Sequence, residues 1–244
     1  MSEIAGQMAA RVGASLLADG ANGVGKGKLV GGVPGVAPAN VVVIGAGVAG
    51  LSATRSAMGM GASVVLMDAS VNRLRGASDH LGNKVVTEVI QELILSKRLS
   101  EADIVIGALA PVEGRTPIVV TEEMIEQMPA GSVVLDISID HGGCFETSEI
   151  TTLSKPTFEK YNVIHYCVPN IASRFARTAS FALSNVFAPI LLAISDEGGI
   201  EQALRYHPEI RTGLYMHKGV LASKALGEWF DLPYSHRDLF FGDL

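Results

Sequence analysis

The chain has 244 residues, of which 48% are hydrophobic and 18% charged, and its formal net charge is −6 at pH 7. A chain of this length can bury a sizeable core in one or two domains. Its acidic balance and its lack of any basic run argue against nucleic acid or an anionic membrane as a partner.

The two cysteines, Cys144 and Cys167, have neither CxxC spacing nor the pattern of a disulfide framework. We therefore expect a reducing, cytoplasmic setting. The N-terminal residues do not resemble a signal peptide, and the apolar stretches are strand-length or interrupted by polar residues, so we expect no membrane span. No HExxH, paired-cysteine or clustered-carboxylate pattern indicates a metal site.

The first predicted element is a helix over residues 2–17, with Ser2 as its N-cap. A glycine-rich loop over residues 19–35 follows. Four apolar residues at positions 41–44 then predict a buried strand. Apolar residues at 62–67 predict a second strand, and the intervening residues 51–61 predict a helix.

The glycines that follow the first strand form a G-x-G-x-x-G motif, made of Gly45, Ala46, Gly47, Val48, Ala49 and Gly50. In such a turn the first glycine permits a sharp bend, the second allows a close approach of the backbone to a pyrophosphate, and the third allows close packing of helix on strand. The start of the helix offers free N–H groups to phosphate. The motif and its context predict a dinucleotide site.

Asp68 ends the second strand, at the distance of about 20 residues expected for the acid that binds a ribose. A carboxylate there accepts hydrogen bonds from ribose hydroxyls and repels a 2′-phosphate, which favours NAD over NADP. The alternative is an ordinary βαβ turn with an exposed acid. Arg73 either reaches a ribose phosphate or is a solvated helix charge.

The remaining elements alternate up to residue 168. We predict helices over residues 71–81, 90–99 and 121–127 and strands over residues 84–87, 102–107, 132–137 and 163–168. This alternation predicts an α/β fold with a doubly wound parallel Rossmann sheet, in which ligands bind beyond the carboxyl ends of the strands. Residues 1–173 form this predicted domain.

Residues 174–244 form an appended helical segment in this prediction. A long apolar helix covers residues 180–195 and should kink at Pro189. Three shorter helical patterns follow near residues 199–206, 208–214 and 219–230, and no strand is evident. The segment is too small and too apolar to be stable alone, so we expect it to complete a second domain.

Asp140 follows the predicted strand over 132–137 and is the candidate catalytic residue. A carboxylate beside a nicotinamide can orient an amine or share in proton transfer. The alternative is a turn residue before Gly142 and Gly143. His141 is a candidate proton donor or a turn residue that points elsewhere. Cys144 has no visible activating base and is expected to be a buried thiol.

Several segments of the chain resemble the alanine dehydrogenase family. They are residues 1–6 (MSEIAG), 31–36 (GGVPGV), 45–50 (GAGVAG), 136–144 (DISIDHGGC) and 165–170 (HYCVPN). The resemblance covers nearly all of the chain, in the same order. It implies NAD-dependent interconversion of L-alanine with pyruvate and ammonia, in a protein that is usually a homohexamer.

The resemblance also implies roles for individual residues. It makes Asp140 the active-site aspartate, Asp68 the ribose-binding acid, Ser2 a neighbour of the cofactor phosphates and Asn170 a neighbour of nicotinamide and substrate. We place Ile137 and Val168, at the ends of the last two predicted strands, among the cofactor-binding residues.

The chain departs from the family pattern at His141, where many members carry glutamine, and in the loop over residues 111–115, which replaces P-G-A-K. Family members are longer and begin with a half that carries the carboxylate-binding arginine and lysine and the acid/base histidine. We therefore expect this chain to bind NAD but to turn over little alone. The alternatives are an NAD(H) module of a transhydrogenase-like assembly and a non-catalytic NAD-binding protein.

Overall fold

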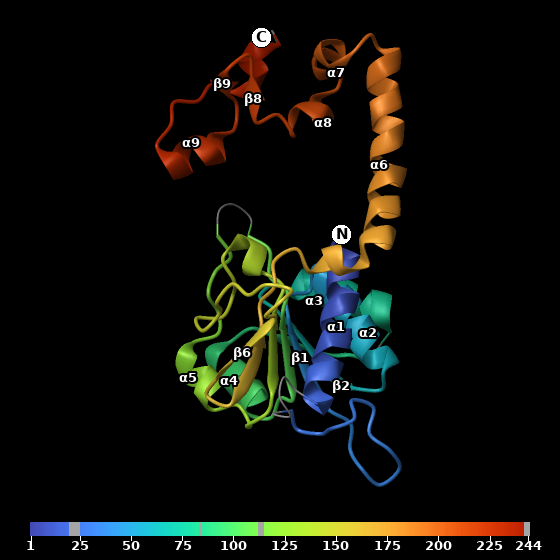
Figure 1. The fold of residues 1–244 in the computed structure, drawn as a ribbon, viewed down its shortest axis with the longest axis vertical. Helices are drawn as coiled ribbons and strands as arrows, with labels where there is room; N and C mark the ends of the chain where they lie inside the picture. Colours follow the sequence, from blue (N-terminus) through green and yellow to red (C-terminus); the bar gives the residue numbers. More distant parts are fainter. Residues whose placement is uncertain (20–24, 83, 112–114, 242–244) are drawn as a thin grey trace. The chain divides into compact units, whose positions relative to one another are not determined.

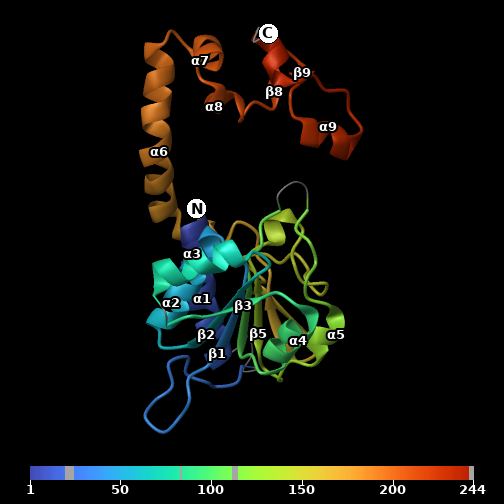
Figure 2. The same ribbon diagram turned by 180° about the vertical axis from the view of Figure 1, so that it is seen from behind.

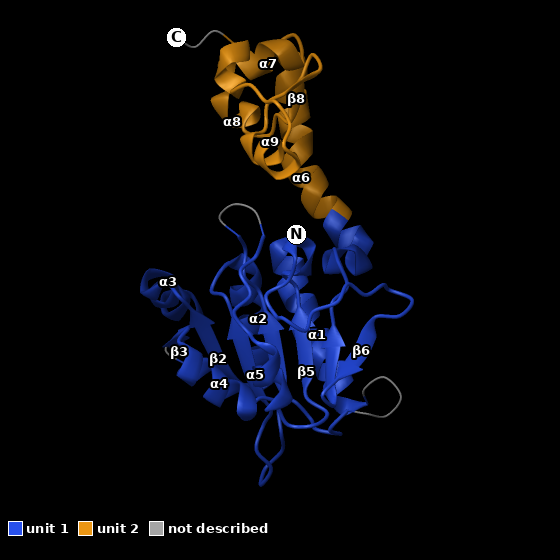
Figure 3. Cartoon of the chain, turned by 90° about the vertical axis from the view of Figure 1, so that its left-hand side faces the viewer, with its two compact units in different colours: residues 1–179 blue, residues 180–244 orange. Residues whose placement is uncertain are grey.

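A computed structural model describes residues 1–19, 25–82, 84–111 and 115–241. The chain divides into two compact units, residues 1–179 and residues 180–244, which are coloured separately in Figure 3. The boundary predicted from the sequence, after residue 173, lies a few residues before this division.

The first unit is a sheet of seven strands between two layers of helices (Figures 1 and 2). In chain order the strands are β1 (Asn40–Ile44), β2 (Ser63–Asp68), β3 (Val86–Val89), β4 (Ile104–Gly107), β5 (Val133–Asp136), β6 (Thr157–Lys160) and β7 (Val163–Tyr166). Their spatial order is β3-β2-β1-β4-β5-β7-β6, and all pairs are parallel except β6 with β7. The doubly wound α/β fold predicted from the sequence is confirmed.

Helices cover both faces of this sheet. They are α1 (Ser2–Ala18), α2 (Val48–Gly59), α3 (Val71–Leu81), α4 (Glu92–Ser100) and α5 (Glu122–Glu126). In β1, Val41 and Val43 pack in the core with α1, α2 and α3, whereas Val42 and Ile44 pack in the core with α4 and α5. Because both faces are buried, the strand is apolar without alternation from Val41 to Ile44.

α1 crosses α2 at very close range, and this crossing brings the start of α1 to the carboxyl edge of the sheet. A Cβ atom on Gly6 would clash with the backbone oxygen of Ala49. The Ser52 hydroxyl donates a hydrogen bond of 2.9 Å to the Glu3 carbonyl across the same contact. Ser2 is the first residue of α1, and Met1 is its N-cap without a side-chain bond, so the prediction of Ser2 as N-cap is wrong by one residue.

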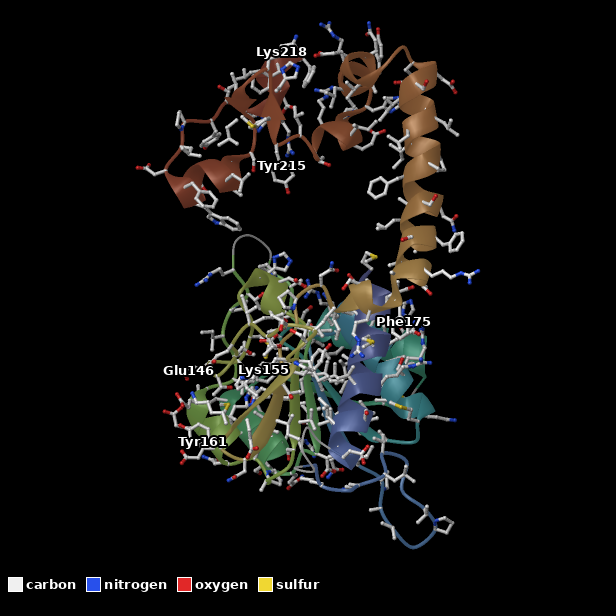
Figure 4. All side chains as sticks on the ribbon, viewed as in Figure 1. Glu146, Lys155, Tyr161, Phe175, Tyr215 and Lys218 are labelled. Carbon is white, nitrogen blue, oxygen red and sulfur yellow. The ribbon has the colours of Figure 1, made fainter. Side chains whose placement is uncertain are left out.

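The structure contains two short hairpins that the sequence analysis did not predict. β6 and β7 are joined by Tyr161 and Asn162, both with positive φ, as the two-residue hairpin turn requires. β8 (Met216–His217) and β9 (Val220–Leu221) are joined in the same way by two residues, Lys218 and Gly219. Tyr161 and Lys218 are labelled in Figure 4. The prediction of no strand after residue 174 is therefore wrong.

Apart from β8 and β9, the described part of residues 171–241 is mainly helical. The elements are η2 (Ile171–Phe175), α6 (Ala176–Asp196), α7 (Ile200–Tyr206), α8 (Pro208–Arg211), α9 (Lys224–Phe230) and η3 (Arg237–Phe240). α6 remains helical through Pro189.

The helical run Ile171–Asp196 has 26 residues, and its most apolar 18-residue window has a mean hydropathy of 1.6, with 6% of that window buried. Within the described residues it is the one helix long and apolar enough to cross a membrane. Core helices of soluble proteins reach the same length and hydropathy. Ser180, Ser184 and Asn185 interrupt the apolar residues of this helix, as the sequence analysis describes, and the absence of a membrane span stays a prediction.

Candidate functional site

The glycine turn after β1 has a different structural reason for each glycine. Gly45 has φ of 110°, and a Cβ atom there would lie 2.6 Å from the Ala108 carbonyl oxygen. A Cβ atom on Gly50 would clash with the Gly45 carbonyl oxygen. Around Gly47, by contrast, no heavy atom of the described residues lies within 4 Å of the Cβ position, apart from Gly47 and its own chain neighbours. The turn is therefore tightly packed on its inner side and open at its centre.

This open side faces the start of α2. Gly47 is the N-cap of α2 and has no side chain with which to cap it. The first N–H groups of a helix have no intrahelical acceptor, and together with the helix dipole they form a site for an anion. The backbone of Val48, Ala49 and Gly50 thus fits a phosphate group placed over Gly47. This is the environment that a dinucleotide pyrophosphate requires.

Asp68 lies at the carboxyl end of β2, next to the same turn. Its side chain is buried, and its two oxygens accept hydrogen bonds of 2.8 Å from the N–H groups of Ala46 and Ser70. The guanidinium of Arg73, which is exposed, lies 3.8 Å from one carboxylate oxygen. Asp68 therefore joins β2 to the glycine turn and keeps a lone pair on each oxygen for a further donor.

A second carboxylate, Asp136, ends β5 and was not singled out as a functional residue in the sequence analysis. Its oxygens accept hydrogen bonds from the N–H groups of Ser138 and Cys144, both 2.9 Å, and from the Ser148 hydroxyl at 2.6 Å. Burial raises the pKa of the Asp136 carboxyl, although these three hydrogen bonds act in the opposite direction. The signal that could have identified it is a charged residue ending an apolar strand.

The turn that follows β5 carries Asp140 and His141 in a single turn of 3₁₀ helix, η1 (Ile139–His141). Gly142 and Gly143 follow with φ of 100° and 81°, a conformation that favours glycine. The Asp140 carboxylate accepts a hydrogen bond of 2.8 Å from the N–H of Asn170, in the loop after β7. Two residues that are 30 positions apart in sequence are thereby fixed together.

Loops from four strands and the start of α1 enclose a cavity of about 200 Å³ at this edge of the sheet. It is lined by Met1, Ser2, Ala5, Ala49, Ala108, Leu109, Ala110, Ile137, Asp140, His141, Asn170, Ile171 and Ala172. The sheet order reverses between β1 and β4, so the cavity lies at the switch point where such sheets bind ligands. Ser2, Ile137, Asp140 and Asn170, separate in sequence, meet here as predicted ligand-contacting residues.

Eight predicted site residues do not line this cavity. Gly45, Ala46, Gly47, Val48 and Gly50 form the glycine turn and the start of α2, and Asp68 ends β2 beside that turn. Val168 is buried in the core, and Arg73 lies on α3 beside Asp68. Of the cofactor loop over residues 111–115, positions 112–114 lie outside the described residues. Arg115 is described: a Cβ atom on Gly142 would lie 3.4 Å from its Nε, so this side chain lies against the Asp140 turn. The sequence analysis did not identify that neighbour.

Neither cysteine has the properties of a nucleophile. Cys144 and Cys167 are buried. Burial raises the pKa of the Cys144 thiol well above its usual range and that of Cys167 to about 12, and the charge of Asp136 adds to both effects. A thiolate is therefore strongly disfavoured at neutral pH. The prediction that Cys144 is a buried thiol is confirmed.

No group of three or more His, Cys, Asp or Glu side chains in the described part of the chain is arranged to hold a metal ion. The arrangement at the switch point instead combines an anion site, a buried carboxylate beside it and a second carboxylate across the cavity. Such a constellation can hold an extended dinucleotide with its phosphates at α2 and its reactive end near Asp140.

Comparison with known proteins gives a consistent result. The family model described as alanine dehydrogenase/PNT, C-terminal domain, matches residues 9–224. An alanine dehydrogenase of Mycolicibacterium smegmatis is 43% identical over 235 residues, which are 96% of this chain and 62% of the relative.

Two solved structures extend the comparison. An L-alanine dehydrogenase is 36% identical, with a TM-score of 0.88 over 94% of this chain and 63% of that chain. A transhydrogenase from Sinorhizobium meliloti is 25% identical, with a TM-score of 0.66 over 79% of this chain and 55% of that one. The chain thus spans less than two thirds of the length of these relatives.

Proposed function

Because the chain belongs to the alanine dehydrogenase/PNT C-terminal domain family, we propose that it supplies the NAD-binding part of an L-alanine dehydrogenase. The reaction converts L-alanine, NAD⁺ and water to pyruvate, ammonium, NADH and a proton, and it is reversible. The observation that carries the proposal is the open Gly47 turn beside the buried Asp68, at the switch point of a doubly wound sheet.

In this proposal, different residues bind different parts of the cofactor. The N–H groups at the start of α2 hold the pyrophosphate, with Ser2 on α1 nearby. The Asp68 carboxylate accepts hydrogen bonds from the adenosine ribose and disfavours a 2′-phosphate. Bound NAD⁺ supplies the acceptor for the hydride that leaves the alanine Cα atom.

Asp140 is the residue we assign to the reacting end. Its carboxylate lines the cavity and is held by the N–H of Asn170, so one oxygen stays oriented while the other is available to a substrate amine. A carboxylate in this place stabilises the positive charge of an ammonium or iminium group and can share in moving its proton.

The cavity lining does not supply a positively charged side chain to pair with the carboxylate of the substrate. Among the described residues that line it there is no arginine or lysine. A carboxylate needs such a partner when it leaves water. We therefore propose that a segment present in the longer relatives, from the same or another polypeptide, completes the active site, and that the chain alone binds NAD with little turnover. The assembly we propose is a cytoplasmic homo-oligomer, a hexamer by family resemblance.

Two measurements test this proposal. Titration of the chain with NADH, followed by nicotinamide fluorescence, should give saturable binding, with NADPH binding more weakly. The rate of NADH formation from L-alanine and NAD⁺ should be low for the chain alone. In the completed enzyme Asp140→Asn should abolish turnover and leave NADH affinity unchanged. Absence of NADH binding by folded protein, or full activity of that variant, would refute the assignment.

A second candidate is an NAD(H) module that passes hydride to a partner protein. It is supported by the similarity to the transhydrogenase structure. This reading requires an NADP-binding partner for turnover and no requirement for L-alanine. Supplying L-alanine without such a partner to the completed enzyme distinguishes the two, because only the dehydrogenase then forms NADH.

A further inference from the structure

Asp136 is a buried carboxylate whose hydrogen-bond partners are all uncharged groups. Its side chain is in the interior at the end of β5, with 1% of the residue exposed. It accepts from two backbone amides and one hydroxyl, and the Cys144 thiol lies 3.8 Å from one oxygen. Among the described residues no lysine or arginine forms an ion pair with it. Its charge is therefore held by dipoles of the neighbouring turn.

The two amides belong to opposite ends of that turn. Ser138 starts the segment that carries Asp140, and Cys144 ends it. Between them, a Cβ atom on Gly143 would lie 2.6 Å from an Asp136 oxygen, so the backbone of the turn rests directly on the carboxylate. One side chain thus ties both ends of a seven-residue turn, residues 138–144, to the sheet.

We propose that Asp136 is a positioning residue that holds this turn, and with it Asp140, in place against the nicotinamide half of the cofactor. This inference rests on the proposed function, because it presumes that NAD occupies the switch point. It goes beyond that function by assigning a separate role to a residue that lines no part of the cavity.

The geometry separates this role from general stabilisation of the fold. The phosphate and adenosine parts of the cofactor are assigned to the loop after β1 and to Asp68 at the end of β2. The Asp136 turn follows β5, on the other side of β4. Loosening the turn should therefore weaken a ligand with a nicotinamide ring and leave one that ends at the second ribose largely unaffected.

The experiment is a pair of titrations, of NADH and of ADP-ribose, with the full chain and its Asp136→Asn variant. Asparagine keeps the shape but turns an NH₂ group toward a backbone N–H, so one anchor is lost. Loss of a buried hydrogen bond to a charged group predicts a rise of about tenfold in the Kd of NADH, with the Kd of ADP-ribose changed less than about twofold. Retained ADP-ribose binding also shows that the variant is folded.

Two further variants sharpen the result. Ser148→Ala removes the hydroxyl bond to Asp136, together with the weak 3.7 Å contact from the Cys167 thiol, and leaves both backbone bonds of Asp136 in place. It should therefore change the NADH to ADP-ribose ratio in the same direction, by about threefold. Asp103→Asn is the matched control: Asp103 is also a buried acid, but it accepts from Lys26, Lys28 and the N–H of Asn40 at the opposite edge of the sheet. That variant should lower stability without changing the ratio.

The outcomes distinguish the two proposals. If the wild-type chain binds neither ligand, the proposed function fails and this inference fails with it. If the wild-type chain binds both, and Asp136→Asn leaves the ratio of the two Kd values unchanged, the proposed function stands and the positioning role is overturned. An equal change in the Kd values of NADH and ADP-ribose, seen in Asp136→Asn and also in Asp103→Asn, would show that Asp136 only stabilises the fold. That result would also overturn the positioning role.

Discussion

At the scale of single residues, three carboxylates at the carboxyl edge of the sheet differ in what they contact. Asp68 bonds to the glycine turn, Asp136 bonds to its own following turn, and Asp140 extends into the cavity and bonds to Asn170. Asp68 and Asp136 are buried, whereas Asp140 is exposed. We therefore propose that the same side-chain chemistry serves ribose recognition at Asp68, positioning at Asp136 and the reacting end at Asp140, because each strand end places the carboxylate differently.

Asp68→Ala should weaken NADH binding by about 10- to 100-fold, since a carboxylate that bonds both ribose hydroxyls contributes on the order of 1.5–3 kcal/mol. NADPH binding should fall less, because the repulsion of its 2′-phosphate is removed at the same time. Fluorescence titration of both cofactors measures the change. An unaltered ratio of NADPH to NADH affinity would remove Asp68 from the ribose site.

The environment of His165 should make the stability of the first unit sensitive to acid. It is buried, its Nε2 lies 2.9 Å from the Thr147 hydroxyl and its Nδ1 lies 3.0 Å from the Val163 carbonyl oxygen. Burial lowers its pKa from 6.5 to about 4, so the folded state holds the neutral ring. The unfolded state then binds more protons between these values, and stability is lost as pH falls below 6.5.

The loss should reach on the order of 3 kcal/mol by pH 4. Urea denaturation at neutral pH and at a series of lower pH values measures it. His165→Gln should reduce the slope of stability against pH through this range, even if it lowers stability at neutral pH. A slope that is the same in both proteins would assign the acid sensitivity to other groups.

At the scale of elements, we propose that the β1–turn–α2–β2 unit binds the phosphates and the adenosine ribose of the cofactor. Gly50→Ala should abolish detectable NADH binding, because its Cβ atom would clash with the Gly45 carbonyl oxygen and force the turn open. Gly59→Ala is the control on the same helix: it has open space at its Cβ position and should bind normally. It should also gain up to about 1 kcal/mol of stability, measured by urea denaturation. Equal binding by both variants would contradict this account of the turn.

The elements also show what could be predicted from sequence and what could not. The long apolar strands and the glycine motif predicted β1, α2 and β2 closely because local patterning and burial agree there. β6, β8 and β9 were missed because they are short and their turns use Tyr161 and Lys218, which are weak turn signals. The place of Asp140 after a strand predicted it as a candidate, and the structure places it in the lining of the cavity. Its bond to Asn170 and the anchoring by Asp136 depend on tertiary contacts that no local pattern encodes.

At the scale of the whole molecule, α6 exposes many large apolar side chains. Leu191 and Leu192 are 63% and 66% exposed, and Val186 and Phe187 are also more than half exposed. Large apolar side chains exposed in this number on one helix are typical of an interaction site or an aggregation hazard. The expectation that this segment needs a packing partner agrees with the exposure of the helix.

The purified chain should therefore self-associate at micromolar concentration, giving a mass by light scattering above the 25.6 kDa of one chain. Replacing Leu191 and Leu192 together by lysine should shift the distribution toward the monomer, because two charges on this face must be desolvated on contact. A wild-type chain that remains monomeric would show that this surface does not drive association.

The distance in sequence between the two ends of the cavity lining has a consequence for folding order. Ser2 and Asn170 meet at one cavity, yet they lie at opposite ends of the first unit, and every strand of the sheet lies between them. Contacts this remote form late, after the loop-closure entropy of the intervening chain has been overcome. A nascent chain that ends before β7 would contain the glycine turn but would lack Asn170, which lines the cavity. We therefore expect the unit to reach full cofactor affinity only after β7 has docked.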